Sequence, residues 1–196
     1  MIKRIKIIRP GYLIRSDTGI ILDARSSVVL IQTEKYNLII DTSIKKDRNL
    51  IINNLSKHDL TPKDIDIVIN THSHHDHTEN NEIFESASIY SHHLNKKVKS
   101  DIKIKDFPFK LDKDILIIET PGHSLDCLSI ILRKKHVFAI TGDSIPIKNN
   151  IINWTPPIIN IDREMAVDSM RKIIKIADVI IPGHDYAFKL KKGIIE

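Results

Sequence analysis

Short apolar runs separated by polar turns open the chain. Runs rich in isoleucine and valine at residues 5–14 and 27–33 predict β-strands, and a polar turn at 34–37 leads into a third strand at 38–41. Consecutive strands joined by tight turns are typical of an antiparallel meander. We therefore expect the fold to begin with antiparallel strands.

Helical and extended patterns alternate in the next segment. Residues 44–58 carry apolar side chains at helical spacing with polar residues between them, and 65–69 is an apolar run of the kind found in buried strands. A short helix at 79–84 and a strand at 87–91 are expected to follow. This alternation of helices and strands indicates an α/β protein.

The second half of the chain repeats this mixture. Asp162 is a candidate N-cap for the helix that follows it, and a loop at 145–161 carries Trp154 and two prolines. The predicted strands are 115–119, 128–132, 137–140 and 178–181, and the predicted helix is 163–176. The strands at 128–132 and 137–140 are close enough to form a hairpin.

Composition sets the broad class of the protein. With 196 residues, 41% of them apolar, the chain is long enough for a sizeable core, and we expect one domain over 1–196. The formal charge of +5 favours anionic partners only weakly, because the basic residues are scattered along the chain. Composition alone therefore does not identify a partner.

Cysteine usage and the N-terminus bear on the compartment. Cys127 is the single cysteine, which excludes an intramolecular disulfide and favours a reducing compartment. Basic residues interrupt the apolar runs of the N-terminus, so a secretory signal is not expected, and no apolar stretch reaches the roughly twenty residues of a membrane span. We expect a cytoplasmic protein without a membrane partner.

The densest chemical signal follows the apolar run 65–69. His72, His74, Asp76 and His77 form the pattern H-x-H-x-D-H. Imidazole and carboxylate groups suit zinc and similar divalent ions. In an extended segment alternate side chains share a face, so His72 and His74 can point at one ion, whereas Asp76 and His77 can face a second ion once the chain turns. A tag or a solvated histidine loop is the alternative, but this stretch is internal and follows a buried strand.

Other metal-ligand types stand at the ends of predicted strands. Asp41, His123, Asp143 and His184 each follow an apolar run, and glycines accompany the last three. Each alone could be an ordinary turn residue, but four strand ends that all deliver such side chains make coincidence a poor explanation. His92 and His93 lack a comparable partner spacing and are interpreted as a strand-end loop.

Together, H-x-H-x-D-H, Pro-Gly-His, Gly-Asp and a second Pro-Gly-His resemble the motifs of the metallo-beta-lactamase superfamily, and the similarity runs from about residue 20 to 188. The resemblance implies an αββα four-layer sandwich, with two mixed β-sheets face to face, helices outside and metal ions at one edge. Within the superfamily, the chain is most like the metallo-beta-lactamase domain-containing protein 1 subgroup.

The resemblance also implies roles for individual residues. One metal ion would be held by His72, His74 and His123 and a second by Asp76, His77 and His184, while Asp143 would bridge the two and Asp41 would orient a ligand from behind. Asp76 and Asp143 are the expected catalytic carboxylates. Histidine at position 74 favours Zn²⁺ over a di-iron centre, with iron or manganese left open. Aspartate at 143, where common zinc β-lactamases have cysteine, disfavours antibiotic hydrolysis.

The expected chemistry is hydrolysis by a hydroxide shared between two metal ions. The first candidate substrate is a small ester, thioester or lactone, and the second is an RNA phosphodiester, suggested by the subgroup resemblance. A mononuclear iron dioxygenase and a non-catalytic metal-binding protein are further alternatives, and a homodimer is left open.

Short loops are expected to build the substrate pocket, with no further substrate domain after His184. The candidate walls of that pocket are His93, Trp154, Pro156, Pro157 and Tyr186, although Trp154 is equally suited to plugging the core.

Overall fold

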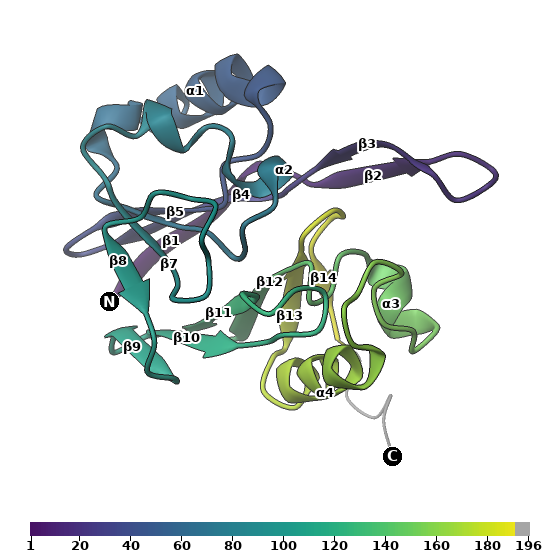
Figure 1. Ribbon diagram of the computed structural model, residues 1–196. Coiled ribbons are helices and arrows are strands. Elements are labelled where there is room, and N and C mark those ends of the chain that lie inside the picture. The colour runs from purple at the N-terminus through teal and green to yellow at the C-terminus, as the bar shows by residue number, and fades with distance from the viewer. Residues whose placement is uncertain (191–196) are drawn as a thin grey trace.

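In the computed structural model, which describes residues 1–190, two six-stranded sheets lie face to face with helices on both outer sides (Figure 1). This is the αββα sandwich predicted from the motifs, and both sheets are mixed as expected. The last six residues of the predicted domain, 191–196, lie outside the described residues. Within the described chain no helix is long and apolar enough to cross a membrane.

The first sheet has the strand order β1-β4-β5-β6-β7-β8. The predicted meander is confirmed, because β1 pairs antiparallel with β4 and β4 with β5, whereas β5 to β8 run parallel. Its strands are β1 (Ile2–Arg9), β4 (Val28–Thr33), β5 (Asn37–Ile40), β6 (Ile67–Ile69), β7 (Ser88–His92) and β8 (Ile102–Ile104).

The second sheet has the order β14-β13-β12-β11-β10-β9. In this sheet β12 and β13 pair parallel, and all other neighbouring strands pair antiparallel. The predicted hairpin is formed by β11 and β12. Its strands are β9 (Phe109–Asp112), β10 (Ile115–Glu119), β11 (Leu128–Arg133), β12 (Val137–Gly142), β13 (Val179–Pro182) and β14 (Phe188–Lys189).

Alternating side chains on the strands assemble three apolar layers. In β4, Val29 and Ile31 face the other sheet, whereas Val28 and Leu30 face the outer helix layer. In β10, Ile115 and its alternate neighbours likewise face inward and the others outward. Because both faces of the central strands are buried, their sequences read as continuous apolar runs rather than alternating ones.

Few helices cover the sheets. On the first sheet, α1 (Arg48–Ser56) buries Ile51 and Leu55, and on the second, α3 (Lys148–Ile152) and α4 (Arg163–Ile174) bury residues such as Met170 and Ile173. The remaining helical pieces are α2 (His75–Thr78) and the 3-10 turns Lys45–Asp47, Pro62–Asp64 and Asn81–Ile83. The Asp162 cap is confirmed, since its carboxylate accepts the Met165 amide at 2.9 Å.

Four element predictions differ from the structure. The predicted strand 5–14 is broken at Pro10 and Gly11, because proline cannot donate to a ladder. In place of the predicted helix 44–58, the structure has a 3-10 turn followed by the shorter helix α1. In place of the predicted short helix 79–84, it has the helix α2 followed by a 3-10 turn. The loop 145–161 contains the helix α3, which the sequence did not indicate.

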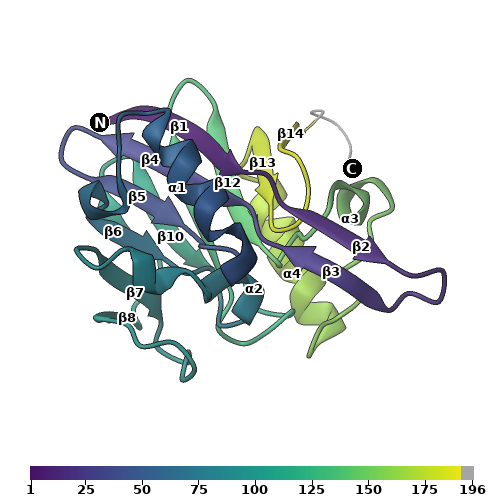
Figure 2. The ribbon, with the colours of Figure 1, turned by 90° about the horizontal axis from the view of Figure 1, so that it is seen from above.

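After the break, β2 (Tyr12–Arg15) and β3 (Ile21–Arg25) form a separate two-stranded ribbon. Figures 1 and 2 show this ribbon extending away from the sandwich, with its base beside α2. Gly11 lies at the base, where an added Cβ would stand 2.3 Å from the carbonyl oxygen of Gly183. Only glycine therefore allows the ribbon to pack this closely on the loop after β13.

Candidate metal centre

Strand ends from both sheets meet at one edge of the sandwich. Asp41 directly follows β5, and the histidine motif follows β6, which is parallel to β5. On the other sheet, His123, Asp143 and His184 follow β10, β12 and β13. Because these strands run toward the same edge, residues more than a hundred positions apart in sequence become neighbours.

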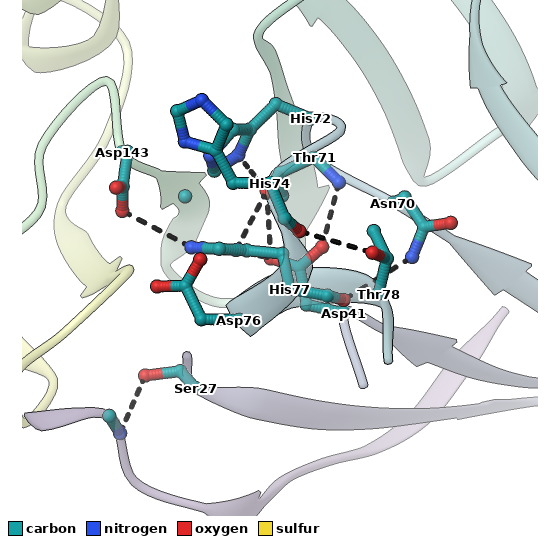
Figure 3. A network of polar contacts seen from close by, with 12 residues as sticks. Ser27, Asp41, Asn70, Thr71, His72, His74, Asp76, His77, Thr78 and Asp143 are labelled. Atoms are coloured by element: carbon teal, nitrogen blue, oxygen red, sulfur yellow. Dashed lines mark hydrogen bonds and ion pairs between the residues drawn. The ribbon is translucent and has the colours of Figure 1, made fainter. Parts of the chain in front are cut away.

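The local backbone of the motif directs its side chains to two places. His74 is extended, at ψ 147°, whereas the chain bends at 71–73, and the rings of His72 and His74 lie 4.6 Å apart. The chain then turns into α2, which carries Asp76 and His77. Figure 3 shows His77 pointing toward Asp143 with Asp76 alongside.

Seven side chains form two adjacent groups of metal-ligand type. The first group contains His72, His74, His123 and Asp143, and the second contains Asp76, His77 and His184. Within each group the candidate ligand atoms all lie within 4.8 Å of one another. These are the seven side chains that the motifs indicated, in the same two groups.

Asp143 lies between the two groups. Its Oδ1 is 3.1 Å from His184 Nε2 and 3.4 Å from His77 Nε2, while its Oδ2 is 3.4 Å from His123 Nε2. One carboxylate thus offers an oxygen to each side, which is the geometry a bridging ligand requires.

Asp41 orients His77 from behind. Its Oδ2 accepts a hydrogen bond from His77 Nδ1 at 2.7 Å and from the Thr71 hydroxyl at 2.7 Å, and its Oδ1 accepts the Thr71 amide at 2.8 Å. Both Asp41 and His77 are buried. Because Nδ1 of His77 donates to Asp41, Nε2 is the nitrogen of this ring that faces the centre.

Backbone carbonyls orient two further histidines in the same way. His184 Nδ1 donates to the Arg25 carbonyl at 2.9 Å, and His123 Nδ1 donates to the Ile159 carbonyl at 2.7 Å. A carbonyl oxygen can only accept, so the proton of each neutral ring is on Nδ1 and the lone pair is on Nε2. Three of the histidines are therefore prepared as ligands by the groups behind them.

The candidate ligand nitrogens lie close to one another. His77 Nε2 lies 3.3 Å from His184 Nε2, and His123 Nε2 lies 2.9 Å from His74 Nδ1, so one ring of each pair can donate to the other. In addition, His72 Nε2 and Asp143 Oδ1 are buried without a hydrogen-bond partner among the described residues. Buried polar atoms without a partner, set among several histidine and carboxylate ligand groups, fit divalent cations.

The pKa values of the clustered side chains also favour cation binding. Burial alone would lower the pKa of His77, but Asp41 and Asp143 outweigh it and raise that pKa well above its ordinary value. Burial alone would raise the pKa of Asp143, but His184 and His77 hold that pKa well below its ordinary value. The pKa of His72 is well below its usual value because of burial and the neighbouring His77. The centre thus combines an ionised carboxylate with histidine nitrogens and attracts positive charge.

Cys127 is not an alternative nucleophile. It is buried, and burial raises the pKa of its thiol to about 12. A thiol with that pKa is protonated at neutral pH and is neither a nucleophile nor a metal ligand. This agrees with its expected place in the core.

A partly buried ionic network holds the base of the ribbon, and no pattern in the sequence indicated it. The Asp47 carboxylate pairs with Arg9 Nε and with Arg25 at 2.7 Å, and Arg25 also pairs with Asp23 at 2.9 Å. Tyr12 donates to Asp23 at 2.7 Å and lies beneath both guanidinium groups. Because the Arg25 carbonyl accepts a hydrogen bond from His184 Nδ1, this network also helps to hold the candidate ligand His184 in place.

A cavity of about 540 Å³ opens onto the two groups. Around the candidate ligands His74, Asp76, His123, Asp143 and His184, most of its wall is apolar. The ribbon and the segments on either side of α3 supply that apolar wall, with Leu13, Ile21, Leu22 and Ala24 from the ribbon and Pro146, Pro157, Ile158 and Ile159 from the segments around α3.

Four of the five expected pocket residues are absent from the described lining of this cavity, namely His93, Trp154, Pro156 and Tyr186. Trp154 packs against the outer apolar layer of the second sheet, so it fills the core. His93 is exposed beside β8, where its amide donates to the Ile104 carbonyl at 2.8 Å, and Tyr186 is 71% exposed. Of the two prolines, Pro157 lines the cavity and Pro156 lines a neighbouring one.

Several residues that shape the centre were not singled out from the sequence. They act through backbone groups, as Arg25 and Ile159 do, or from behind the ligands, as Thr71 does. The exposed His75 also lines the cavity. One signal was available, since Ser16-Asp17-Thr18-Gly19 is a turn sequence between two short apolar runs and predicts the ribbon.

Replacing Asp41 with asparagine is expected to weaken Zn²⁺ binding by about tenfold to a hundredfold. The asparagine amide would present a second donor to His77 Nδ1, so the ring would lose the partner that fixes its tautomer and orientation. Competition with a chromophoric chelator measures the change. Asp66→Asn, at the far end of β6, is the matched control, because Asp66 accepts the Asn37 amide away from the centre. Equal zinc affinity in both variants would contradict this role of Asp41.

Comparisons with known proteins identify the family and agree with the fold. A family model of the metallo-beta-lactamase superfamily matches residues 22–103. A probable metallo-hydrolase from Methanocaldococcus jannaschii is 44% identical over 181 residues, which cover 92% of this chain and 86% of that protein. Metallo-beta-lactamase domain-containing protein 1 from Xenopus laevis is 30% identical over 182 residues, which cover 89% of this chain and 76% of that protein.

Solved structures share the fold. A probable metal-dependent hydrolase from Staphylococcus aureus superposes with a TM-score of 0.75 at 24% identity, over 93% of this chain and 83% of that one. An N-acyl homoserine lactone hydrolase with N-hexanoyl-L-homoserine at its catalytic metal centre superposes with a TM-score of 0.74 at 20% identity, over 94% of both chains.

Proposed function

The chain belongs to the metallo-beta-lactamase superfamily and is a metal-dependent hydrolase, and from that premise we propose that it holds two zinc ions and hydrolyses a small ester, thioester or lactone. His72, His74 and His123 would hold one ion, Asp76, His77 and His184 would hold the other, and Asp143 would bridge them. The observation that carries the proposal is the convergence of histidine ring nitrogens fixed from behind by Asp41, Arg25 and Ile159.

Bound divalent ions supply Lewis acidity, which polarises a carbonyl oxygen and lowers the pKa of water from about 15.7 to about 7. Hydrolysis then adds the oxygen of water to the carbonyl carbon, breaks the bond to the leaving alcohol or thiol and passes a proton to that group. We assign the proton-accepting role to Asp76, because its carboxylate lines the cavity and lies 3.4 Å from His184 Nε2. Asp143 would hold the two metal sites at a fixed separation by binding both ions.

The cavity wall favours an acyl substrate over an RNA phosphodiester. Arg15 is the only lysine or arginine among the residues that line it, whereas aliphatic side chains from the ribbon and the loop after α3 form most of the wall. Proteins that bind nucleic acid neutralise several phosphates with lysine and arginine. The structurally similar N-acyl homoserine lactone hydrolase acts on a substrate with an apolar acyl chain, which is consistent with this preference.

A paired screen tests the proposed chemistry. Protein purified without chelator is expected to hydrolyse 4-nitrophenyl esters, thioesters and lactones of medium-chain acids, and to turn over bis(4-nitrophenyl) phosphate far more slowly. Leu22→Asp on the exposed side of the cavity should lower the kcat/KM for the apolar esters by about tenfold, because it places a charge against the acyl chain. Faster cleavage of the phosphodiester, or of RNA in a salt-dependent manner, would favour the nuclease instead.

Three further points belong to the same proposal. We place the whole chain, 1–196, in a single domain, because the three apolar layers form one sandwich. Zinc is preferred over iron or manganese because most of the candidate ligands are histidines. The cytoplasm is the proposed compartment on the basis of the single Cys127, and a homodimer stays an open prediction.

A further inference from the structure

A second cavity of about 490 Å³ adjoins the one at the metal centre. The two cavities share Leu13, Arg15, Pro146, Pro157 and Ile158, so they form one groove. The groove runs between the ribbon and the segment around α3, which lie side by side in Figure 2. A substrate at the metal centre can therefore extend into the second cavity.

The second cavity has a different charge from the first. Arg15 and Arg163 line it, and its lining contains no aspartate or glutamate, whereas the first cavity contains Asp23 and the candidate ligands Asp76 and Asp143. Its other polar side chains are amides and one hydroxyl, namely Asn149, Asn150, Asn153, Thr155 and Asn160. Arg163 and these polar side chains line the second cavity alone, whereas Arg15 lines both cavities and marks the place where they meet.

Both arginines have donors to offer a ligand. Within the described residues Arg163 makes no ion pair or side-chain hydrogen bond, and it is exposed at the first position of α4. Arg15 is half-buried and donates from one nitrogen, Nη1, to the Gly19 carbonyl at 2.8 Å. A guanidinium group has five N–H donors in a planar fork that matches a carboxylate.

Apart from Arg15, the residues shared by the two cavities are apolar. Leu13, Pro157 and Ile158 belong to both cavities and would contact the middle of an extended substrate. Asp23, the acidic residue of the ribbon that lines the first cavity, is already engaged by Arg25 and Tyr12. The groove therefore offers a hydrolytic centre, an aliphatic stretch and two cationic side chains.

We propose that the second cavity is a binding subsite for a terminal carboxylate, so that the preferred substrates are esters or thioesters carrying a carboxylate at the end of an aliphatic chain. The proposal rests on the proposed hydrolase function for the first end of the groove. Arg15 and Arg163 bind the carboxylate, and the shared apolar wall contacts the methylene chain. Charge-assisted hydrogen bonds of this kind correspond to a preference of about tenfold or more.

Matched substrates test the subsite. Mono-4-nitrophenyl esters of dicarboxylic acids of increasing chain length are compared with analogues whose terminal carboxylate is replaced by a carboxamide. A second series places the charge on the alcohol, which covers the opposite orientation of the ester. One chain length is expected to show a kcat/KM ratio of about ten or more in favour of the carboxylate, mainly through KM. Arg163→Gln and Arg15→Gln should bring that ratio close to one, whereas Arg171→Gln, an exposed arginine on the same helix, should not.

An equilibrium measurement separates this inference from the hydrolase assignment. The corresponding anilides, with terminal carboxylate or carboxamide, are titrated calorimetrically into the protein as purified. Tighter binding of the carboxylate, lost in Arg163→Gln, supports the subsite even if no ester is hydrolysed, and in that case only the hydrolase proposal fails. Equal binding of both anilides, or a preference that both arginine variants retain, overturns the subsite while leaving hydrolysis of neutral esters unaffected.

Discussion

Replacing Asp143 with alanine is expected to lower the rate of ester hydrolysis by about a thousandfold or more, while leaving the metal-free protein folded. Asp143 is the one side chain that reaches both groups, through Oδ1 to His184 and His77 and through Oδ2 to His123. If Asp143 bridges the two ions as proposed, its loss removes a ligand from each of them, and the effect should exceed the roughly tenfold to hundredfold effect of losing a group behind the ligands. The kcat/KM for the best ester of the screen measures the loss.

A matched variant separates chemistry from stability. Asp168→Ala removes an exposed carboxylate from α4 that pairs only with Arg171, and it should retain wild-type turnover. Circular dichroism of the chelated proteins should show similar melting for wild type and Asp143→Ala, because the apolar layers do not include this residue. Wild-type turnover in Asp143→Ala would contradict the proposal that Asp143 bridges the two ions, and it would also contradict the proposed catalytic centre.

Removing bound metal is expected to abolish hydrolysis and to lower the melting temperature. A ligand present at about a thousand times its dissociation constant stabilises the folded state by about 4 kcal/mol, which corresponds to roughly 8–16 °C for a chain of this size. The candidate ligands follow strands of both sheets, so a bound zinc ion would link the two sheets. Scanning calorimetry before and after dialysis against chelator measures this shift.

Reconstitution supplies the control for metal removal. Adding Zn²⁺ to the dialysed protein should restore both the hydrolysis and the melting temperature, whereas the same zinc should raise the melting temperature of Asp143→Ala by less. A chelated protein that keeps full activity would contradict the dependence on metal, and an equal zinc-induced shift in both proteins would place the stabilising ion elsewhere.

The ligand positions could be predicted from the sequence because they lie at strand ends. The run 65–69 is so apolar that it had to be buried, and the polar residues directly after it had to emerge at an edge of the sheet. The same reasoning located His123, Asp143 and His184, whose spatial grouping matches the one that the motifs implied. The curated relatives support the superfamily to which those motifs pointed.

The walls of the pocket could not be predicted in this way. Trp154 has a left-handed backbone, at φ 49°, and its ring packs against the outer face of the second sheet, a direction that depends on the intervening helix α3. Apolar residues of the ribbon, such as Ile21 and Leu22, look like ordinary strand residues until the ribbon is seen to leave the sandwich. Exposed apolar side chains become a substrate wall only through the tertiary arrangement.

Backbone partners were equally hidden. His184 and His123 are oriented by the carbonyl groups of Arg25 and Ile159, and every residue type carries such a group. The close passage of Gly122 beside α4 is similar, because an added Cβ would stand 2.4 Å from the Ala166 nitrogen and the glycine has φ +133°. The need for glycine before His123 is therefore understood only once the helix is in place.

An anomalous difference map, recorded at the zinc absorption edge from crystals of protein purified without chelator, tests the two-ion centre most directly. We expect two peaks at the edge of the sandwich, one surrounded by His72, His74 and His123 and the other by Asp76, His77 and His184, with the Asp143 carboxylate between them. A single peak, peaks away from these side chains or the absence of any peak would contradict the account.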